Sequence, residues 1–135
     1  MSFNATLVIF YTNATNSLVI PSIPDEPEVW FTMKSMAMFP DESSTVQISR
    51  THGLLFSNGQ SISGSMGAIH SMDGSISVSS GSIASIYISA IAAPILFGNL
   101  ANDFTGEIKT KSSASIVTVV TQFPIELRVA LTKAI

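Results

Sequence analysis

The sequence predicts an all-β fold: a single antiparallel β-sandwich of jelly-roll-like type, with about eight to ten short strands. Short runs of β-branched and aromatic residues recur at the spacing of roughly 8–12 residues that such folds show. Gly, Pro and Asn punctuate these runs, while apolar residues at helical spacing are nearly absent. At 135 residues the chain has the length of one domain, so we expect one β-sandwich domain spanning residues 1–135.

The first part of the chain combines two predicted strands with a polar loop. Residues 5–12 are rich in β-branched and aromatic side chains, an Asn/Thr turn follows at 13–16, and 18–20 form a second short strand. Three prolines and three carboxylates then fall within 21–28. Because proline interrupts regular structure and carboxylates favour water, we expect this segment to be a solvated loop.

The segment 29–39 is compatible with two structures. Met33, Met36 and Met38 suit a helix, whereas the β-branched and aromatic residues at its start suit a buried strand. We favour the strand because a proline bounds the segment closely on each side. Residues 45–50 follow as another strand, since apolar and polar side chains alternate there.

Turn dipeptides divide the middle of the chain. The Asn-Gly pair at 58–59 lies between two strand-like runs and is typical of a type I′ β-hairpin. An Asp-Gly pair at 73–74 and a Ser-Gly pair at 80–81 divide the Ser- and Ile-rich stretch that follows. We expect the positive φ angles of these turns to fall on Gly, Asn or Asp, which accept that conformation.

Three further strands are expected near the C-terminus, at 106–111, 115–122 and 125–132. The last of them alternates most regularly, with aliphatic residues at every second position. Before them, residues 92–102 contain an early proline, which suits either a short helix or a covered loop.

Charge is the most unusual property of the chain. Between Arg50 and Asp103 the sequence runs for 52 residues with Asp73 as its single formal charge. Charged residues make up 11% of the whole chain, against about 25% in a typical soluble domain. Because the uncharged strands alternate small polar with aliphatic residues, each should have one apolar and one hydroxyl-rich face. We expect the uncharged surface to be covered by another subunit or to serve as a neutral contact.

Composition argues against several other functions. The net charge is −3 and the six Lys and Arg are scattered, whereas a nucleic-acid surface needs clustered cations, so no nucleic acid is expected as a partner. The chain has no Cys and therefore no disulfide. Glycine-rich phosphate-binding motifs are absent, and the carboxylates lack the spacing of a calcium loop. No cofactor and no metal site are expected.

Neither a membrane span nor a catalytic centre is expected. The apolar stretch 83–100 is interrupted by polar residues and lacks cationic flanks. The apolar run near the N-terminus is too short for a signal peptide. His52 and His70 are the only histidines, and the nucleophile-elbow motif is absent, so we expect structural roles for both and no enzymatic activity.

These observations favour an obligate homo-oligomer. A mean hydropathy of +0.44 means more apolar side chains than a small isolated domain readily buries. We expect a structural subunit that contacts itself and a larger protein assembly: a virion capsid decoration, cement or minor coat protein. Its location would be a virion or other extracellular assembly reached without a signal peptide, with the cytoplasm as the alternative. The expected contact residues are Met33, Met36, Met38, Ile76, Val78, Ile83, Ile86 and Ile88.

Two other functions stay open. A carbohydrate- or surface-binding, lectin-like module would use Trp30 to stack on a ligand, although a lone Trp in a sheet more often packs between two sheets. A pore former would insert the alternating strands of 61–91 as hairpins, but the runs between the turns are at or below the length that spans a bilayer.

Overall fold

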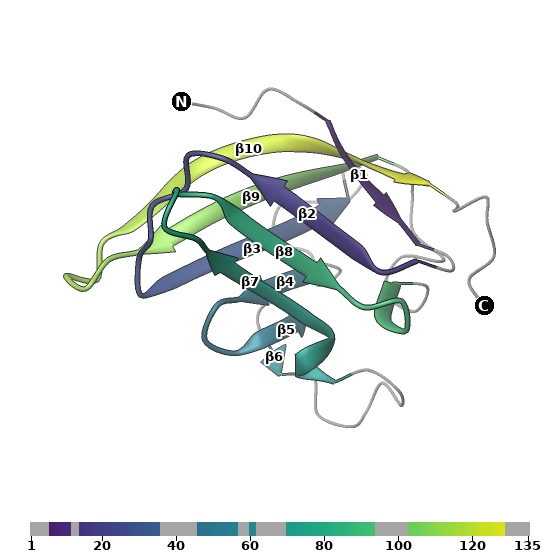
Figure 1. The fold of residues 1–135 in the computed structure, drawn as a ribbon, viewed down its shortest axis with the longest axis horizontal. Coiled ribbons are helices and arrows are strands. Elements are labelled where there is room, and N and C mark those ends of the chain that lie inside the picture. The colour runs from purple at the N-terminus through teal and green to yellow at the C-terminus, as the bar shows by residue number, and fades with distance from the viewer. Residues whose placement is uncertain are drawn as a thin grey trace.

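A computed structural model describes residues 6–11, 14–35, 46–56, 60–61, 70–93 and 103–128. In this part of the chain ten strands form two sheets that enclose one core (Figure 1). The all-β fold with two sheets is therefore confirmed, and β-strands account for most of the described residues.

The strands vary in length from two to twelve residues. They are β1 (Leu7–Phe10), β2 (Asn16–Ile20), β3 (Glu28–Ser35), β4 (Val46–Ser49), β5 (Gly53–Phe56), β6 (Gln60–Ser61), β7 (Gly74–Val78), β8 (Ala84–Ile88), β9 (Asp103–Lys111) and β10 (Val117–Arg128). A 3₁₀ turn, η1 (Ser71–Asp73), precedes β7.

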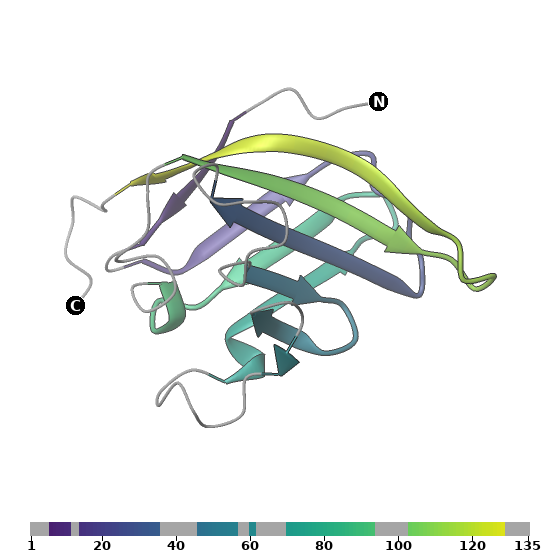
Figure 2. The same ribbon diagram turned by 180° about the vertical axis from the view of Figure 1, so that it is seen from behind.

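The two sheets differ in size and shape. The larger has seven strands in the order β1-β10-β9-β3-β4-β5-β6 and curls into a half-barrel, seen from its own side in Figure 2. The smaller has three strands in the order β2-β8-β7 and lies nearer the viewer in Figure 1. Every pairing is antiparallel, as predicted, except that β1 runs parallel to β10.

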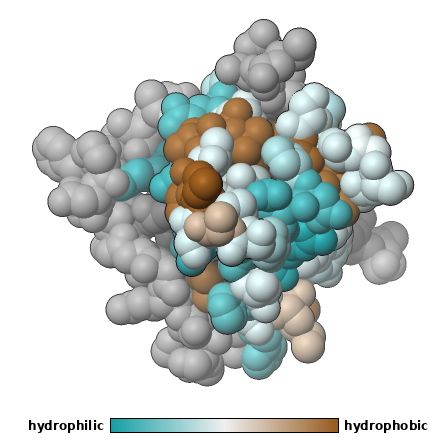
Figure 3. All heavy atoms as spheres, turned by 90° about the vertical axis from the view of Figure 1, so that its left-hand side faces the viewer, coloured by the Kyte–Doolittle hydropathy of each residue, from teal (hydrophilic) through white to brown (hydrophobic). Residues whose placement is uncertain are grey.

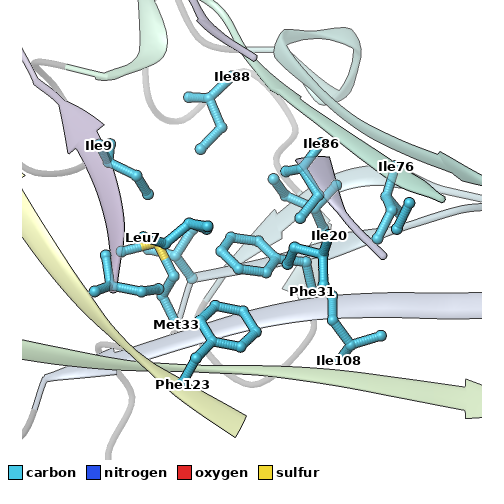
Figure 4. Close-up of a cluster of buried hydrophobic side chains, with 14 of the residues drawn as sticks. Leu7, Ile9, Ile20, Phe31, Met33, Ile76, Ile86, Ile88, Ile108 and Phe123 are labelled. Atoms are coloured by element: carbon cyan, nitrogen blue, oxygen red, sulfur yellow. The ribbon is translucent and has the colours of Figure 1, made fainter. Parts of the chain in front are cut away.

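The core lies between the sheets and consists of side chains from alternate positions on both. Phe31 on β3 and Phe123 on β10 stack with their ring centroids 6.2 Å apart, and Ile86 of the smaller sheet lies over them among other aliphatic residues (Figure 4). On β7 and β8 every second residue is buried. The predicted alternation of the Ser/Ile-rich tract is thereby confirmed in both strands.

The segment 29–39 is a strand as far as the structure describes it, since β3 runs from Glu28 to Ser35. The predicted hairpin around 58–59 is confirmed by the pairing of β5 with β6, in which Phe56 faces Gln60. The turn itself, and therefore its type, lies outside the described residues. Of the segment 92–102, Ala92 and Ala93 are helical, and the rest is likewise outside the described residues.

The prediction for the positive φ angles is wrong for the turn at 80–81, where the positive φ falls on Ser82. Two turns outside that prediction also place a positive φ on serine: Ser22 in the β2–β3 connection and Ser115 in the β9–β10 connection. Hydrogen bonds three residues apart close two of these turns: Ser82 N–H donates to the carbonyl oxygen of Ser79 (3.0 Å), and Ser115 N–H to that of Ser112 (2.9 Å). The hydrogen bond that closes each turn therefore holds Ser82 and Ser115 at a positive φ, although serine ordinarily prefers a negative φ. Gly74, in contrast, has an extended φ of −139°.

The two strands expected at 115–122 and 125–132 are a single strand over their described part. β10 continues through Pro124, which pairs with Thr105 on β9. Proline is tolerated there because β1 begins to pair with β10 only at Ile125. A register shift between Val119 and Thr121 marks a β-bulge in the same strand.

Candidate functional site

The outward side of the smaller sheet carries no formal charge on its strands, and we call it the neutral face. Its residues alternate with the buried ones, and all of them are exposed. They are Ser17, Val19, Ser75, Ser77, Ser85 and Tyr87. The register places them in two rows across the sheet: Ser17–Tyr87–Ser75 and Val19–Ser85–Ser77.

The chemistry of the neutral face suits a protein contact. Serine hydroxyls lose little on leaving water if they find partners across a contact, and an uncharged surface has no ion to desolvate. Tyr87 lies in the middle of its row with 38% exposure, and Tyr is one of the residue types that contribute most at protein interfaces. Val19 adds an aliphatic side chain that is 56% exposed.

The predicted contact residues are distributed differently. Five of them have side chains buried in the core of the chain itself, which leaves them no surface to offer a folded partner: Met33, Ile76, Val78, Ile86 and Ile88. For these five the prediction is corrected, because they face the other sheet and the serines beside them face outward. Ile83 is 38% exposed in the β7–β8 connection. Met36 and Met38 lie outside the described residues.

Trp30 does not pack between the sheets. Val29 and Phe31 on either side of it are buried in the core, so Trp30 points outward from the larger sheet and is half-buried there. Its cross-strand neighbours are Ser49 on β4 and Lys109 on β9. The core interpretation of this residue is therefore corrected, and its indole is available on the surface.

A third exposed feature is the end of the β9–β10 hairpin, which extends beyond the two sheets (Figure 1). Ile116, Val117 and Val119 are 63%, 53% and 49% exposed there. Figure 3 views the molecule from this end, and hydrophobic atoms lie beside strongly hydrophilic ones on that surface. The mixture reflects aliphatic side chains next to the charged loops at the same end.

A polar network organises those loops. The Glu28 carboxylate accepts hydrogen bonds from the Ser49 hydroxyl (3.0 Å), from the Thr51 hydroxyl and from the Val29 N–H (3.1 Å). The guanidinium of Arg50 contacts the Asp25 carboxylate at 2.5 Å and donates to the carbonyl oxygen of Glu26 (2.8 Å). These bonds join the β2–β3 loop to the β4–β5 turn, so the predicted solvated loop is held in a defined conformation.

The network also changes the acidity of Glu28. Partial burial raises the pKa of this carboxyl, but the hydrogen bonds from Thr51, Ser49 and Val29 outweigh it and hold the pKa below its ordinary value. The carboxylate therefore stabilises the two loops in its ionised form.

The two histidines are the sequence candidates for acid–base chemistry. His52 and His70 are both exposed, at opposite ends of the stretch 52–70. In the described part of the chain, no three His, Cys, Asp or Glu residues come together in a way that would hold a metal ion. Over the same residues, no helix has the length and apolar character needed to cross a membrane.

Comparison with known proteins gives no family for this chain. No protein-family model matches it, and no curated protein matches it.

Proposed function

We propose that this protein is a non-enzymatic structural subunit that assembles with copies of itself through the neutral face. The observation that carries the proposal is the composition of that face: six outward side chains of a three-stranded sheet, four of them serine, without a charge among them. A soluble sheet usually presents Lys or Glu to water at such positions, and these charges also prevent edge-to-edge association.

The setting we propose is a protein shell, such as a virion to which the subunit adds as a decoration, cement or minor coat protein. A shell subunit acts by burying surface and needs no catalytic group. A jelly-roll relation would suit that setting, and it stays a prediction, since the sheets here have seven and three strands in place of two sheets of similar size.

A new charge in the middle of the neutral face tests the proposal. Ser85 lies on the central strand of the sheet, between Val19 and Ser77, so Ser85→Arg places an unpaired guanidinium inside the proposed contact. We expect the mass of the assembly, measured by light scattering, to fall while circular dichroism and cooperative unfolding stay unchanged. Ser71→Arg is the matched control, because Ser71 is also exposed but lies in η1, outside both sheets. An unchanged assembly mass for Ser85→Arg would contradict the proposal.

A second candidate function is carbohydrate binding at Trp30. The outward position of the indole favours it, because the side chain shares its face with Thr32 and Gln47, and Gln47 donates to the Thr32 hydroxyl at 3.4 Å. An indole can stack on a sugar ring while such groups form hydrogen bonds to the hydroxyls. A glycan array probed with the wild type and with Trp30→Ala tests this candidate. Binding that the substitution abolishes supports it, and the absence of binding to any glycan removes it.

A further inference from the structure

A compact patch on the outer face of the larger sheet combines an indole, two lysines and two valines; we call it the Trp–Lys patch. Trp30 faces Lys109, and Lys109 in turn faces Val119 on β10. One step toward the hairpin end, Lys111 faces Val117. Because residues directly opposite in an antiparallel pair point to the same side of a sheet, all five side chains belong to one surface.

The Trp–Lys patch is open to solvent, and its positive charge is only partly compensated. The Lys109 side chain is 41% exposed, and its amine lies 3.8 Å from Glu107, whose other carboxylate oxygen accepts a hydrogen bond from Gln122 (2.7 Å). Glu28 faces Lys111 on the same side of the sheet, but its carboxylate accepts hydrogen bonds from the Ser49 and Thr51 hydroxyls. Within the described ranges Lys111 therefore has no ion-pair partner. An aromatic residue, aliphatic side chains and two amines together favour an acidic ligand that also has apolar surface.

The chain itself carries a segment of that chemistry. Residues 24–27 read Pro-Asp-Glu-Pro, and we call them the acidic proline loop. Its two prolines and Asp25 are exposed, with the Asp25 side chain 60% accessible. Arg50 fixes the loop by contacting the Asp25 carboxylate and the Glu26 carbonyl oxygen. The loop is therefore held in shape before any partner binds, which lowers the entropic cost of association.

The two surfaces lie next to each other at one end of the molecule. The acidic proline loop leads directly into β3, whose first residue, Glu28, faces Lys111. The β2–β3 connection and the β9–β10 hairpin extend toward the same side in Figure 1. In a two-fold dimer each contact occurs twice, with residue i of one subunit on residue j of the other and the reverse. Adjacent complementary surfaces are what such an arrangement requires.

We infer that a second copy of this chain binds at the Trp–Lys patch, in a two-fold dimer where each subunit's acidic proline loop lies on the other's patch. The carboxylates of the loop would pair with Lys109 and Lys111, and a proline ring would pack on Trp30. This inference rests on the proposed function and deepens it, because it adds a second and electrostatic contact to the one formed by the neutral face. A sugar at Trp30 would leave the charges of both surfaces unexplained.

A charge exchange tests the inference, and Ser85→Arg is used as the background so that only the second contact remains. In that background we expect a dimer, with a mass twice the 14.3 kDa of the chain. Lys111→Glu and Glu26→Lys should each weaken the dimer by about tenfold or more in dissociation constant, because each places like charges across both copies of the contact.

An equal mixture of the two charge variants should restore association, since every contact in the mixed dimer again joins opposite charges. The restored affinity separates a charge contact from a folding defect, which mixing would not repair. Raising the salt concentration should weaken the wild-type and the mixed dimer alike.

Three results would overturn the inference: self-association of both charge variants at the wild-type affinity, failure of the mixture to associate, or binding of a glycan at Trp30 by a strictly monomeric protein. If the charge variants assemble normally and Ser85→Arg does not, the inference fails and the proposed function stands. If Ser85→Arg leaves the assembly intact while the charge exchange works, the proposed function of the neutral face fails instead.

Discussion

Gly106 allows the two longest strands of the larger sheet to pack against the core. It lies on the inner face of β9, opposite Phe123 on β10 and Met33 on β3. A Cβ atom at this position would come within 2.5 Å of Phe123 Cε2 and 2.6 Å of Ile125 Cδ1. Phe123 has little room to move, because its ring stacks on Phe31. Gly106→Ala is therefore expected to overpack the core.

The size of the effect follows from the packing. Overpacking by a methyl group typically costs about 1–3 kcal/mol, because neighbouring side chains leave their preferred rotamers. An unfolding entropy of about 2.1 cal/mol/K per residue gives about 280 cal/mol/K for the 135 residues. Each kcal/mol then corresponds to about 3.5 °C, so the midpoint of thermal unfolding should fall by about 4–10 °C.

Gly81→Ala provides the matched control. Gly81 is exposed in the β7–β8 connection, and the nearest atom to an added Cβ, Ile83 Cδ1, is 3.8 Å away, an ordinary contact. Urea unfolding at one fixed protein concentration, followed by circular dichroism, should show a lower free energy of unfolding for Gly106→Ala alone. Equal stability of the two variants, within about 0.5 kcal/mol, would refute the packing of β9 against β10 described above.

Two further predictions concern single side chains. Ile86→Ala should lower the free energy of unfolding, measured in urea, by about 2–5 kcal/mol because it leaves a cavity in the core. Ile83→Ala, at a site that is 38% exposed, should lower it by about 1 kcal/mol or less. Equal losses for the two variants would contradict the burial of Ile86 in the core. The pKa of Glu28 is lowered in the folded state. Its contribution to the free energy of unfolding is therefore present at pH values above its ordinary pKa of 4.5, and it is lost as the pH falls through the lower pKa of the folded state. Glu28→Gln should therefore lower the free energy of unfolding by about 1 kcal/mol at pH 7, and acidification should then destabilise this variant less than it destabilises the wild type. Glu26→Gln should stay within about 0.5 kcal/mol of the wild type at pH 7 and lose stability on acidification as the wild type does.

The alternating strands were predictable because local pattern and burial agree in them. In β8 the isoleucines alternate with Ser85 and Tyr87, and the isoleucines are the buried set. The alternation of Ile125 and Leu127 with charged residues likewise predicted the inward side of β10. In such strands a shift by one residue would expose every aliphatic side chain, so the register is strongly determined.

Features that depend on distant partners were not predictable. The serine turns are one example: Ser82 accepts a hydrogen bond from the Ile23 N–H (2.9 Å) in another connection, and no local preference shows this contact. The continuity of β10 through Pro124 depends on where β1 begins to pair. Trp30 has apolar neighbours in sequence, and its outward direction follows only once Val29 and Phe31 are known to be inside.

The candidate surfaces were predictable only in kind. The charge-free tract indicated a neutral contact, but isoleucines were assigned to it because apolar area was expected at a subunit boundary. In the folded chain that apolar area is used within the sandwich, and the serines of the same strands are left outside. The Trp–Lys patch joins β3 to the β9–β10 hairpin, two parts of the chain that are far apart in the sequence, and no single segment contains its pattern.

The absolute mass of the untagged wild-type protein, measured by light scattering across a range of concentrations, tests the central claim most directly. We predict a stable species whose mass is a multiple of 14.3 kDa and persists on dilution. A mass of 14.3 kDa at every concentration would contradict the account, because both the neutral face and the Trp–Lys patch would then be exposed on a stable monomer.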